Sequence, residues 1–116
     1  MDITVNHVEI PVLDLKRAKE FFEAIFGWIV NTESMPNYGI VEIKNSASIG
    51  FFKVEKVPAK GINVVFEVED IPLKLQEIEK AGGQIVKQKY EIAPNIGYSA
   101  QFLDCFGNEF GLYSKE

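Results

Sequence analysis

The feature that most constrains the fold is an internal repeat, with a displacement close to half of the 116-residue chain. When the sequence is displaced by 56 positions, the distance from Asp14 to Asp70, residues 5–30 meet identical or similar residues of the second half. Such a repeat indicates two copies of one supersecondary unit. The identical pairs are Val8 and Val64, Val12 and Val68, Asp14 and Asp70, Glu23 and Glu79, Gly27 and Gly83, Ile29 and Ile85, and Val30 and Val86.

Each copy has the same predicted order: a strand, a helix and three further strands. The first strands, at 6–12 and 62–68, alternate between two faces. Asp14 and Asp70 are the predicted helix N-caps, and glycines end both helices. The later strands are predicted at 28–32, 38–43 and 47–54 in the first copy, and at 84–90, 97–103 and 109–113 in the second.

This order predicts an α+β fold of tandem βαβββ modules. The modules are residues 1–56 and 61–116, joined by the linker 57–60 into one domain. A sheet that carries one helix on one face leaves its other face open. We expect two curved mixed sheets that bring their open faces together around a cavity.

Composition excludes several classes of protein. An apolar fraction of 47% that includes nine Phe, four Tyr and one Trp is enough for a packed core. The net charge of −5 and the absence of a basic cluster argue against nucleic acid or membrane as a partner. A single cysteine, Cys105, in a predicted turn, excludes a disulfide within the chain and is expected to be an incidental thiol. With no signal-peptide pattern at its start, the chain is expected in the cytoplasm.

Two segments resemble the vicinal oxygen chelate superfamily, which includes glyoxalase I, bleomycin-resistance proteins, extradiol dioxygenases and fosfomycin-resistance enzymes. They are Asn6–Val12 leading to Asp14, and Phe102–Tyr113 with its Gly107-Asn108 turn. The resemblance covers nearly the whole chain and implies a homodimer, whose modules pair within one chain or between two. It implies a fold more specifically than a reaction, because the superfamily hosts several chemistries.

The resemblance also implies where a metal ion would bind. Enzymes of this superfamily hold one divalent metal through His and Glu side chains from strands of both halves. In this sequence the four ligand positions correspond to His7, Gly50, Asn63 and Gly111, so only His7 is retained. An amide is a poor substitute for imidazole, and glycine has no side chain. We therefore expect no cofactor, a divalent metal only if this mapping is wrong, and extra room for a ligand at the two glycines.

The expected function is that of a bleomycin-resistance-like protein that holds a small organic ligand between its sheets. The alternative is a glyoxalase-like lyase, isomerase or dioxygenase that uses a divalent metal or His7 and Glu9 as an acid–base pair. The other interpretation is that neither residue is functional: His7 is then a hydrogen-bonded structural residue, and Glu9 is a solvated surface residue. Tyr38 is a further candidate for the cavity wall. The expected cavity residues are His7, Glu9, Gly50, Phe52, Asn63, Glu67, Tyr98, Gln101 and Gly111.

Overall fold

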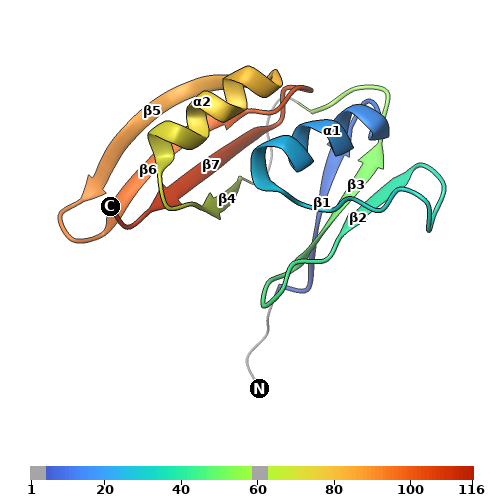
Figure 1. The fold of residues 1–116 in the computed structure, drawn as a ribbon, viewed down its shortest axis with the longest axis horizontal. Helices are drawn as coiled ribbons and strands as arrows, with labels where there is room; N and C mark the ends of the chain where they lie inside the picture. Colours follow the sequence, from blue (N-terminus) through green and yellow to red (C-terminus); the bar gives the residue numbers. More distant parts are fainter. Residues whose placement is uncertain (1–4, 59–62) are drawn as a thin grey trace. The chain divides into compact units, whose positions relative to one another are not determined.

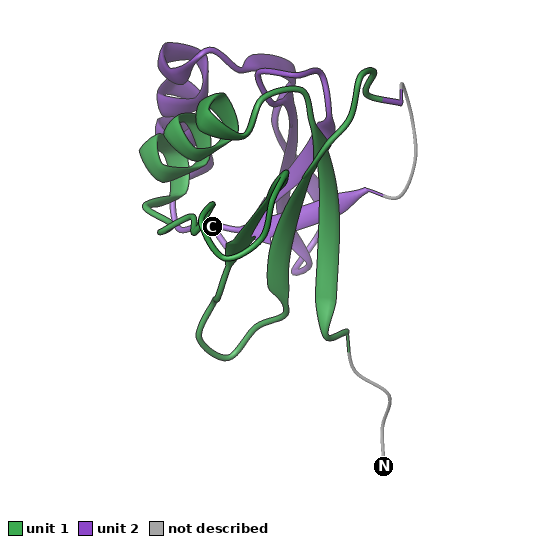
Figure 2. Cartoon of the chain, turned by 90° about the vertical axis from the view of Figure 1, so that its right-hand side faces the viewer, with its two compact units in different colours: residues 1–57 green, residues 58–116 purple. Residues whose placement is uncertain are grey.

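The structure is a computed structural model that describes residues 5–58 and 63–116. The chain divides into two compact units, residues 1–57 and 58–116 (Figure 2). The first unit contains β1 (His7–Val12), α1 (Leu15–Phe26), β2 (Tyr38–Val41) and β3 (Ser48–Lys53). The second contains β4 (Val64–Glu67), α2 (Ile71–Ala81), β5 (Gln84–Ala93), β6 (Gly97–Leu103) and β7 (Glu109–Ser114) (Figure 1).

Each unit has one mixed sheet and one helix, so the predicted α+β class is confirmed. The closure of two sheets around a cavity and the joining of two modules into one domain stay predictions. Linker residues 59 and 60 and the predicted strand start at residue 62 lie outside the described residues. Within the described ranges, neither helix is long and apolar enough to cross a bilayer.

The two sheets share a strand pattern. The first has the order β1-β3-β2 and the second β4-β7-β6-β5, so in each unit the first strand lies parallel to the last. Glu9 lies opposite Gly50 in the first sheet, and Val65 lies opposite Gly111 in the second. Because Glu9 and Val65 are related by the 56-residue displacement, the sequence repeat also relates the registers of the two sheets.

The helix boundaries follow from local chemistry, as predicted. The Asp14 carboxylate accepts a hydrogen bond from the Arg17 N–H at 3.0 Å, and the Asp70 carboxylate accepts one from the Leu73 N–H at 3.0 Å. These bonds satisfy N–H groups that lack partners in the first helical turn. The helices end at glycines with φ angles of 68° and 106°, a region that glycine adopts without strain.

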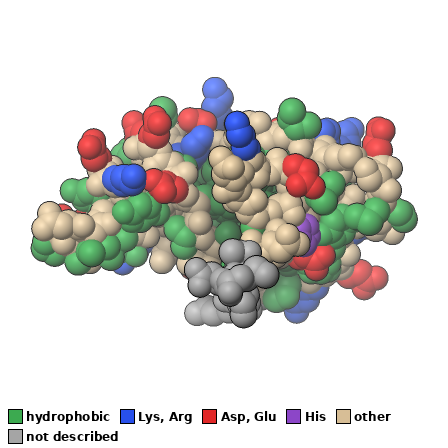
Figure 3. Space-filling model, turned by 90° about the horizontal axis from the view of Figure 1, so that it is seen from below, with side chains coloured by type: hydrophobic (Ala, Val, Ile, Leu, Met, Phe, Trp, Pro, Cys, Tyr) green, Lys and Arg blue, Asp and Glu red, His purple; other side chains and the backbone are tan. Residues whose placement is uncertain are grey.

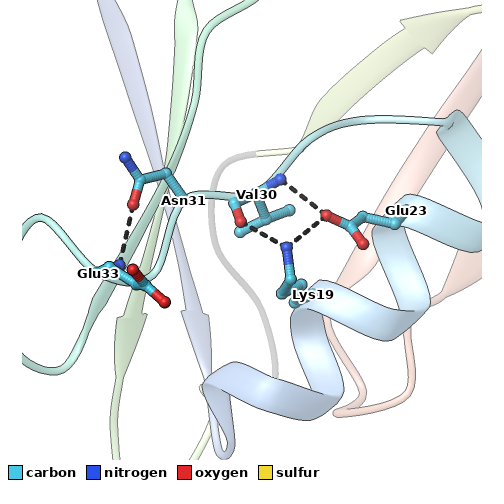
Figure 4. Close-up of polar contacts among 5 residues, drawn as sticks. All are labelled: Lys19, Glu23, Val30, Asn31 and Glu33. Carbon is cyan, nitrogen blue, oxygen red and sulfur yellow. Dashed lines mark hydrogen bonds and ion pairs between the residues drawn. The ribbon is translucent and has the colours of Figure 1, made fainter.

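The predicted strand at 28–32 is wrong, and α1 supplies the reason. The Val30 N–H donates to Glu23 Oε2 at 3.0 Å, and the Lys19 ammonium donates to the Val30 carbonyl at 2.8 Å (Figure 4). A second hydrogen bond from the Lys19 ammonium, to Glu23 Oε2 at 2.7 Å, and the Val30 N–H hold the pKa of Glu23 below its ordinary value. Side chains of the helix therefore satisfy the Val30 backbone groups, and only the isolated bridge between Asn31 and Ile40 remains.

The buried core of each unit lies between its helix and one face of its sheet (Figure 1). The ring of Phe22 on α1 contacts the rings of Phe51 and Trp28, with centroids 4.8 and 5.6 Å apart, so the aromatic core of the first unit extends to the partly buried Trp28. In the second unit the helix buries Ile71, Leu75 and Ile78. Because side chains alternate along a strand, the residues on the opposite face of each sheet are the ones available for a site.

Candidate functional site

The face of the first sheet that points away from α1 carries the candidate site. The ladder places His7 opposite Ser48, Glu9 opposite Gly50, and Tyr38 opposite Phe52. These positions are out of phase with the buried Ile10, Val12, Ile49 and Phe51, so their side chains belong to the other face of the sheet. In the space-filling view the one histidine side chain reaches the surface with acidic side chains close to it (Figure 3).

The hydroxyl of Tyr38 joins His7 to Glu9. It donates to Glu9 Oε2 at 2.9 Å and lies 2.6 Å from His7 Nε2, while His7 Nδ1 lies 2.7 Å from the Ser48 hydroxyl. A phenol has one proton to donate, and Glu9 accepts it, so His7 Nε2 must donate to the Tyr38 oxygen. We refer to His7, Tyr38 and Glu9 as the His7–Tyr38–Glu9 cluster.

Gly50 allows the Tyr38 side chain to cross the central strand. A Cβ atom at Gly50 would overlap the Tyr38 hydroxyl and come within 2.6 Å of His7 Nε2. Tyr38 extends from the edge strand β2, across β3, to the two side chains on β1. The extra room that the sequence predicted at Gly50 is therefore filled from within the chain, which corrects that expectation.

Burial raises the pKa of Tyr38 to about 12, and the hydrogen bond to Glu9 and the negative charge of Glu9 add to the effect. Each factor disfavours the phenolate, because burial removes its hydration and Glu9 repels it. The phenol of Tyr38 is therefore neutral near pH 7 and serves as a hydrogen-bond donor.

An alkaline titration tests this arrangement. We expect wild type and Tyr38→Phe to show equal tyrosinate absorbance near 295 nm at pH 10.5, because Tyr38 is still protonated there. Since its folded pKa lies above the unfolded value of 10.0, Tyr38 adds stability that is present below pH 10.0 and is lost as the pH rises through about 12. An absorbance deficit of one tyrosine in Tyr38→Phe at pH 10.5 would contradict the geometry.

The remaining predicted residues of the first unit lie on this face or border it. Glu9 is exposed, and His7 and Phe52 are partly buried. Phe52 lies directly opposite Tyr38 in the ladder and two residues beyond Gly50 on β3, so both belong to the open face. The structure thus brings together His7, Glu9, Gly50 and Phe52. The sequence treated Tyr38 only as a possible wall, although it forms the centre of the cluster.

The second unit places its predicted residues on two faces. Gln101 and Val65 lie on either side of Gly111, and Asn63 Nδ2 is 3.6 Å from the position of a Cβ at Gly111. Val65 Cγ2 lies 3.0 Å from that position, so the space at Gly111 is also largely taken. Exposed Glu67 lies two residues beyond Val65 on β4.

Tyr98 is the predicted residue that the structure separates from this group. It lies in phase with the buried Ala100 and Phe102, on the face opposite to Gln101. Residues three apart on a regular strand point to opposite faces, so Tyr98 and Gln101 do not line one surface. The Lys89 ammonium lies 4.6 Å from the centroid of the Tyr98 ring.

The donor set does not fit a divalent metal. Among the described residues there is no group of three or more His, Cys, Asp or Glu side chains that could hold one. His7 is the one imidazole of the chain, and its Nε2 atom donates to Tyr38. A first-row metal site generally needs about three protein ligands, and Gly50 and Gly111 supply no side chain.

Comparisons with known proteins agree on the fold. The family model for the Glyoxalase/Bleomycin resistance protein/Dioxygenase superfamily matches residues 4–112. A glyoxylase-like domain-containing protein of Didymella fabae is 22% identical over 119 residues, covering 96% of this chain and 93% of its own.

Two solved structures are similar over nearly their whole length. A glyoxalase/bleomycin resistance protein/dioxygenase family enzyme from Burkholderia phytofirmans has a TM-score of 0.81 and 19% identity, covering 96% of this chain and 98% of its own. A mutant of the fosfomycin resistance protein FosX from Listeria monocytogenes, complexed with Mn(II) and 1S,2S-dihydroxypropylphosphonic acid, has a TM-score of 0.81 and 18% identity. It covers 100% of this chain and 93% of its own. At these identities the likeness concerns the fold alone.

Proposed function

This chain belongs to the Glyoxalase/Bleomycin resistance protein/Dioxygenase superfamily, whose model matches residues 4–112, and we propose a binding function for it on that basis. We infer that it binds a small organic ligand without a metal ion. The recognition surface is the open face of the first sheet, at the His7–Tyr38–Glu9 cluster. The observation that supports this proposal most strongly is the hydrogen bond between His7 Nε2 and the Tyr38 hydroxyl oxygen, which are 2.6 Å apart.

Within residues 5–58 and 63–116 no set of side chains suits a divalent metal, which supports a binding mode that uses the side chains directly. The mutant FosX structure holds Mn(II). In this chain two of the four corresponding positions are glycines and one is an asparagine, while the retained His7 donates to a phenol. Hydrogen bonds from the cluster and contact with nearby apolar side chains are therefore the interactions left for a ligand.

The electrostatics of the face favour a ligand with a hydrogen-bond donor or a positive charge. Glu9 is exposed, and its Oε2 atom accepts from Tyr38, whereas Oε1 accepts no hydrogen bond from the described residues. The chain carries a net charge of −5. Phe52 and Ile40 lie in the same rows of the sheet as Tyr38 and Glu9 and offer an apolar surface beside the carboxylate.

Calorimetric titration with benzylamine, benzamidine and tyramine tests the proposed function. The His7→Ala/Glu9→Ala double variant should bind these amines more weakly by roughly tenfold or more, the value of one hydrogen bond to a charged group. Glu20→Ala, which removes an exposed carboxylate of α1, is the matched control and should bind like wild type. Equal affinities of wild type and the double variant for an amine that binds would contradict the proposal. No binding of any amine by wild type would contradict the preference for a positive charge.

The geometry does not favour the alternative of a lyase, isomerase or dioxygenase. His7 and Glu9 are joined through Tyr38, whose pKa of about 12 makes it a poor proton carrier near pH 7. The homodimer and the cytoplasmic location stay predictions of the sequence.

A further inference from the structure

The His7–Tyr38–Glu9 cluster is arranged around one hydroxyl oxygen. His7 Nε2 donates to that oxygen at 2.6 Å, and Glu9 Oε2 accepts its proton at 2.9 Å. A hydroxyl both accepts and donates, so it satisfies both partners at once. An ammonium group cannot accept from His7, and a carbonyl or ether oxygen cannot donate to Glu9.

Ser48 is the hydrogen-bond partner on the other side of the His7 ring. Its hydroxyl lies 2.7 Å from His7 Nδ1, on the strand that pairs with β1. When Ser48 donates to Nδ1, the neutral imidazole carries its proton on Nε2, facing Tyr38. His7 is thereby positioned as a donor toward the hydroxyl, with Glu9 as the acceptor on the other side.

Tyr38 can leave this position without disturbing the sheet. It is the first residue of the four-residue edge strand β2, and only its side chain crosses β3. Its ring end passes over Gly50, where no side chain stands between the phenol and the strand. Rotation of a partly exposed side chain breaks its hydrogen bonds but none of the strand ladder.

We propose that the cluster is a hydroxyl-recognition site, that Tyr38 is its internal occupant, and that the ligand class is a phenol or alcohol that displaces Tyr38. This inference rests on the proposed function, since it names the ligand class of the same surface. The Tyr38 phenol shows the recognition geometry: its oxygen lies between His7 and Glu9, and its ring lies over Gly50.

The Tyr38→Ala variant tests the inference by removing the occupant and leaving the two partners. Phenol, anisole and benzene are titrated into it while the unfolding midpoint and the heat of binding are followed. Phenol offers both a donor and an acceptor, anisole an acceptor only, and benzene neither. Phenol should bind more tightly than anisole or benzene by roughly tenfold, as expected for a hydrogen bond to a charged acceptor.

Two comparisons test whether the preference for phenol comes from the cluster. The Tyr38→Ala/Glu9→Leu variant should lose the preference for phenol, because no acceptor remains. Tyr90→Ala, which removes a tyrosine of β5 from under the Lys87 ammonium, should show no such preference. If Tyr38→Ala does not fold, Tyr38→Phe serves instead. It removes only the competing hydroxyl and should bind phenol several-fold more tightly than wild type.

The outcomes separate this inference from the proposed function. If Tyr38→Ala binds phenol, anisole and benzene equally, while benzylamine binds wild type in a Glu9-dependent way, the hydroxyl inference is wrong and the proposed function stands. If phenol is preferred and the preference requires Glu9, the inference is supported even where the amines fail. If neither the amines nor phenol binds, both are wrong.

Discussion

Replacing Phe22 with alanine is expected to lower the free energy of unfolding by about 3–5 kcal/mol, the usual cost of deleting a buried aromatic ring. Phe22 has 0% exposure, and its ring centroid lies 5.1 Å from that of Phe21 and 4.8 Å from that of Phe51. Phe51 lies on β3 next to Gly50, so the cavity would also loosen the strand that supports the candidate site. Urea denaturation followed by circular dichroism measures the change.

An exposed leucine on the other helix provides the control. Leu73 is 52% exposed on α2, so Leu73→Ala should change the free energy of unfolding by no more than about 0.5 kcal/mol. A cost below about 1.5 kcal/mol for Phe22→Ala would be less than a buried phenylalanine supplies. Such a result would mean that the aromatic core of the first unit is not packed as described.

Replacing Asp104 with alanine is expected to cost about 2–4 kcal/mol, because two backbone N–H groups would lose their acceptor. Asp104 is 3% exposed, and its carboxylate accepts from the N–H groups of Phe106 and Asn108, each at 2.9 Å. The Asn108 amide donates to its other oxygen at 2.9 Å. These bonds hold the turn that connects β6 to β7, the strands that carry Gln101 and Gly111.

The pH dependence of this cost has a definite sign. Burial raises the pKa of Asp104 above its ordinary value of 3.8, against the opposing effect of the hydrogen bonds from Asn108, Phe106 and Gly107. A raised folded pKa gives a contribution that is fully present below pH 3.8 and is lost as the pH rises through the folded pKa. The difference in stability between wild type and Asp104→Ala should therefore grow as the pH falls from 7. A difference that shrinks on acidification would contradict this assignment.

Local signals in the sequence predicted much of the fold. The caps Asp14 and Asp70 and the two-residue alternation depend on neighbours in the chain, and the structure confirms the two helices. The sequence did not predict the parallel pairing of the first and last strands of each unit. The predicted strand at 28–32 failed for a tertiary reason. Lys19 and Glu23 of α1, which lie 11 and 7 residues before Val30, take the backbone groups of Val30 that a strand would have used.

The candidate site was predicted only in part, because its central contact depends on strand order. Periodicity placed His7 and Glu9 on one face, but it carries no information on which strand lies between β1 and β2. Once β3 is central, Gly50 becomes the position that a large side chain from β2 can cross. Tyr38 is 29 residues from Glu9 in sequence, so its role follows from the register of the ladder.

The nuclear magnetic resonance spectrum of the His7 imidazole shows whether His7 Nε2 donates to Tyr38 or binds a metal ion. The chain has one histidine, so its signals need no assignment. We expect a protonated Nε2 with contacts to the Tyr38 ring, whose centroid is 6.3 Å from that of His7. One equivalent of Zn²⁺ should leave both ring-nitrogen signals unchanged. Loss of the Nε2 proton together with stoichiometric zinc binding would show that His7 is a metal ligand and would contradict the account.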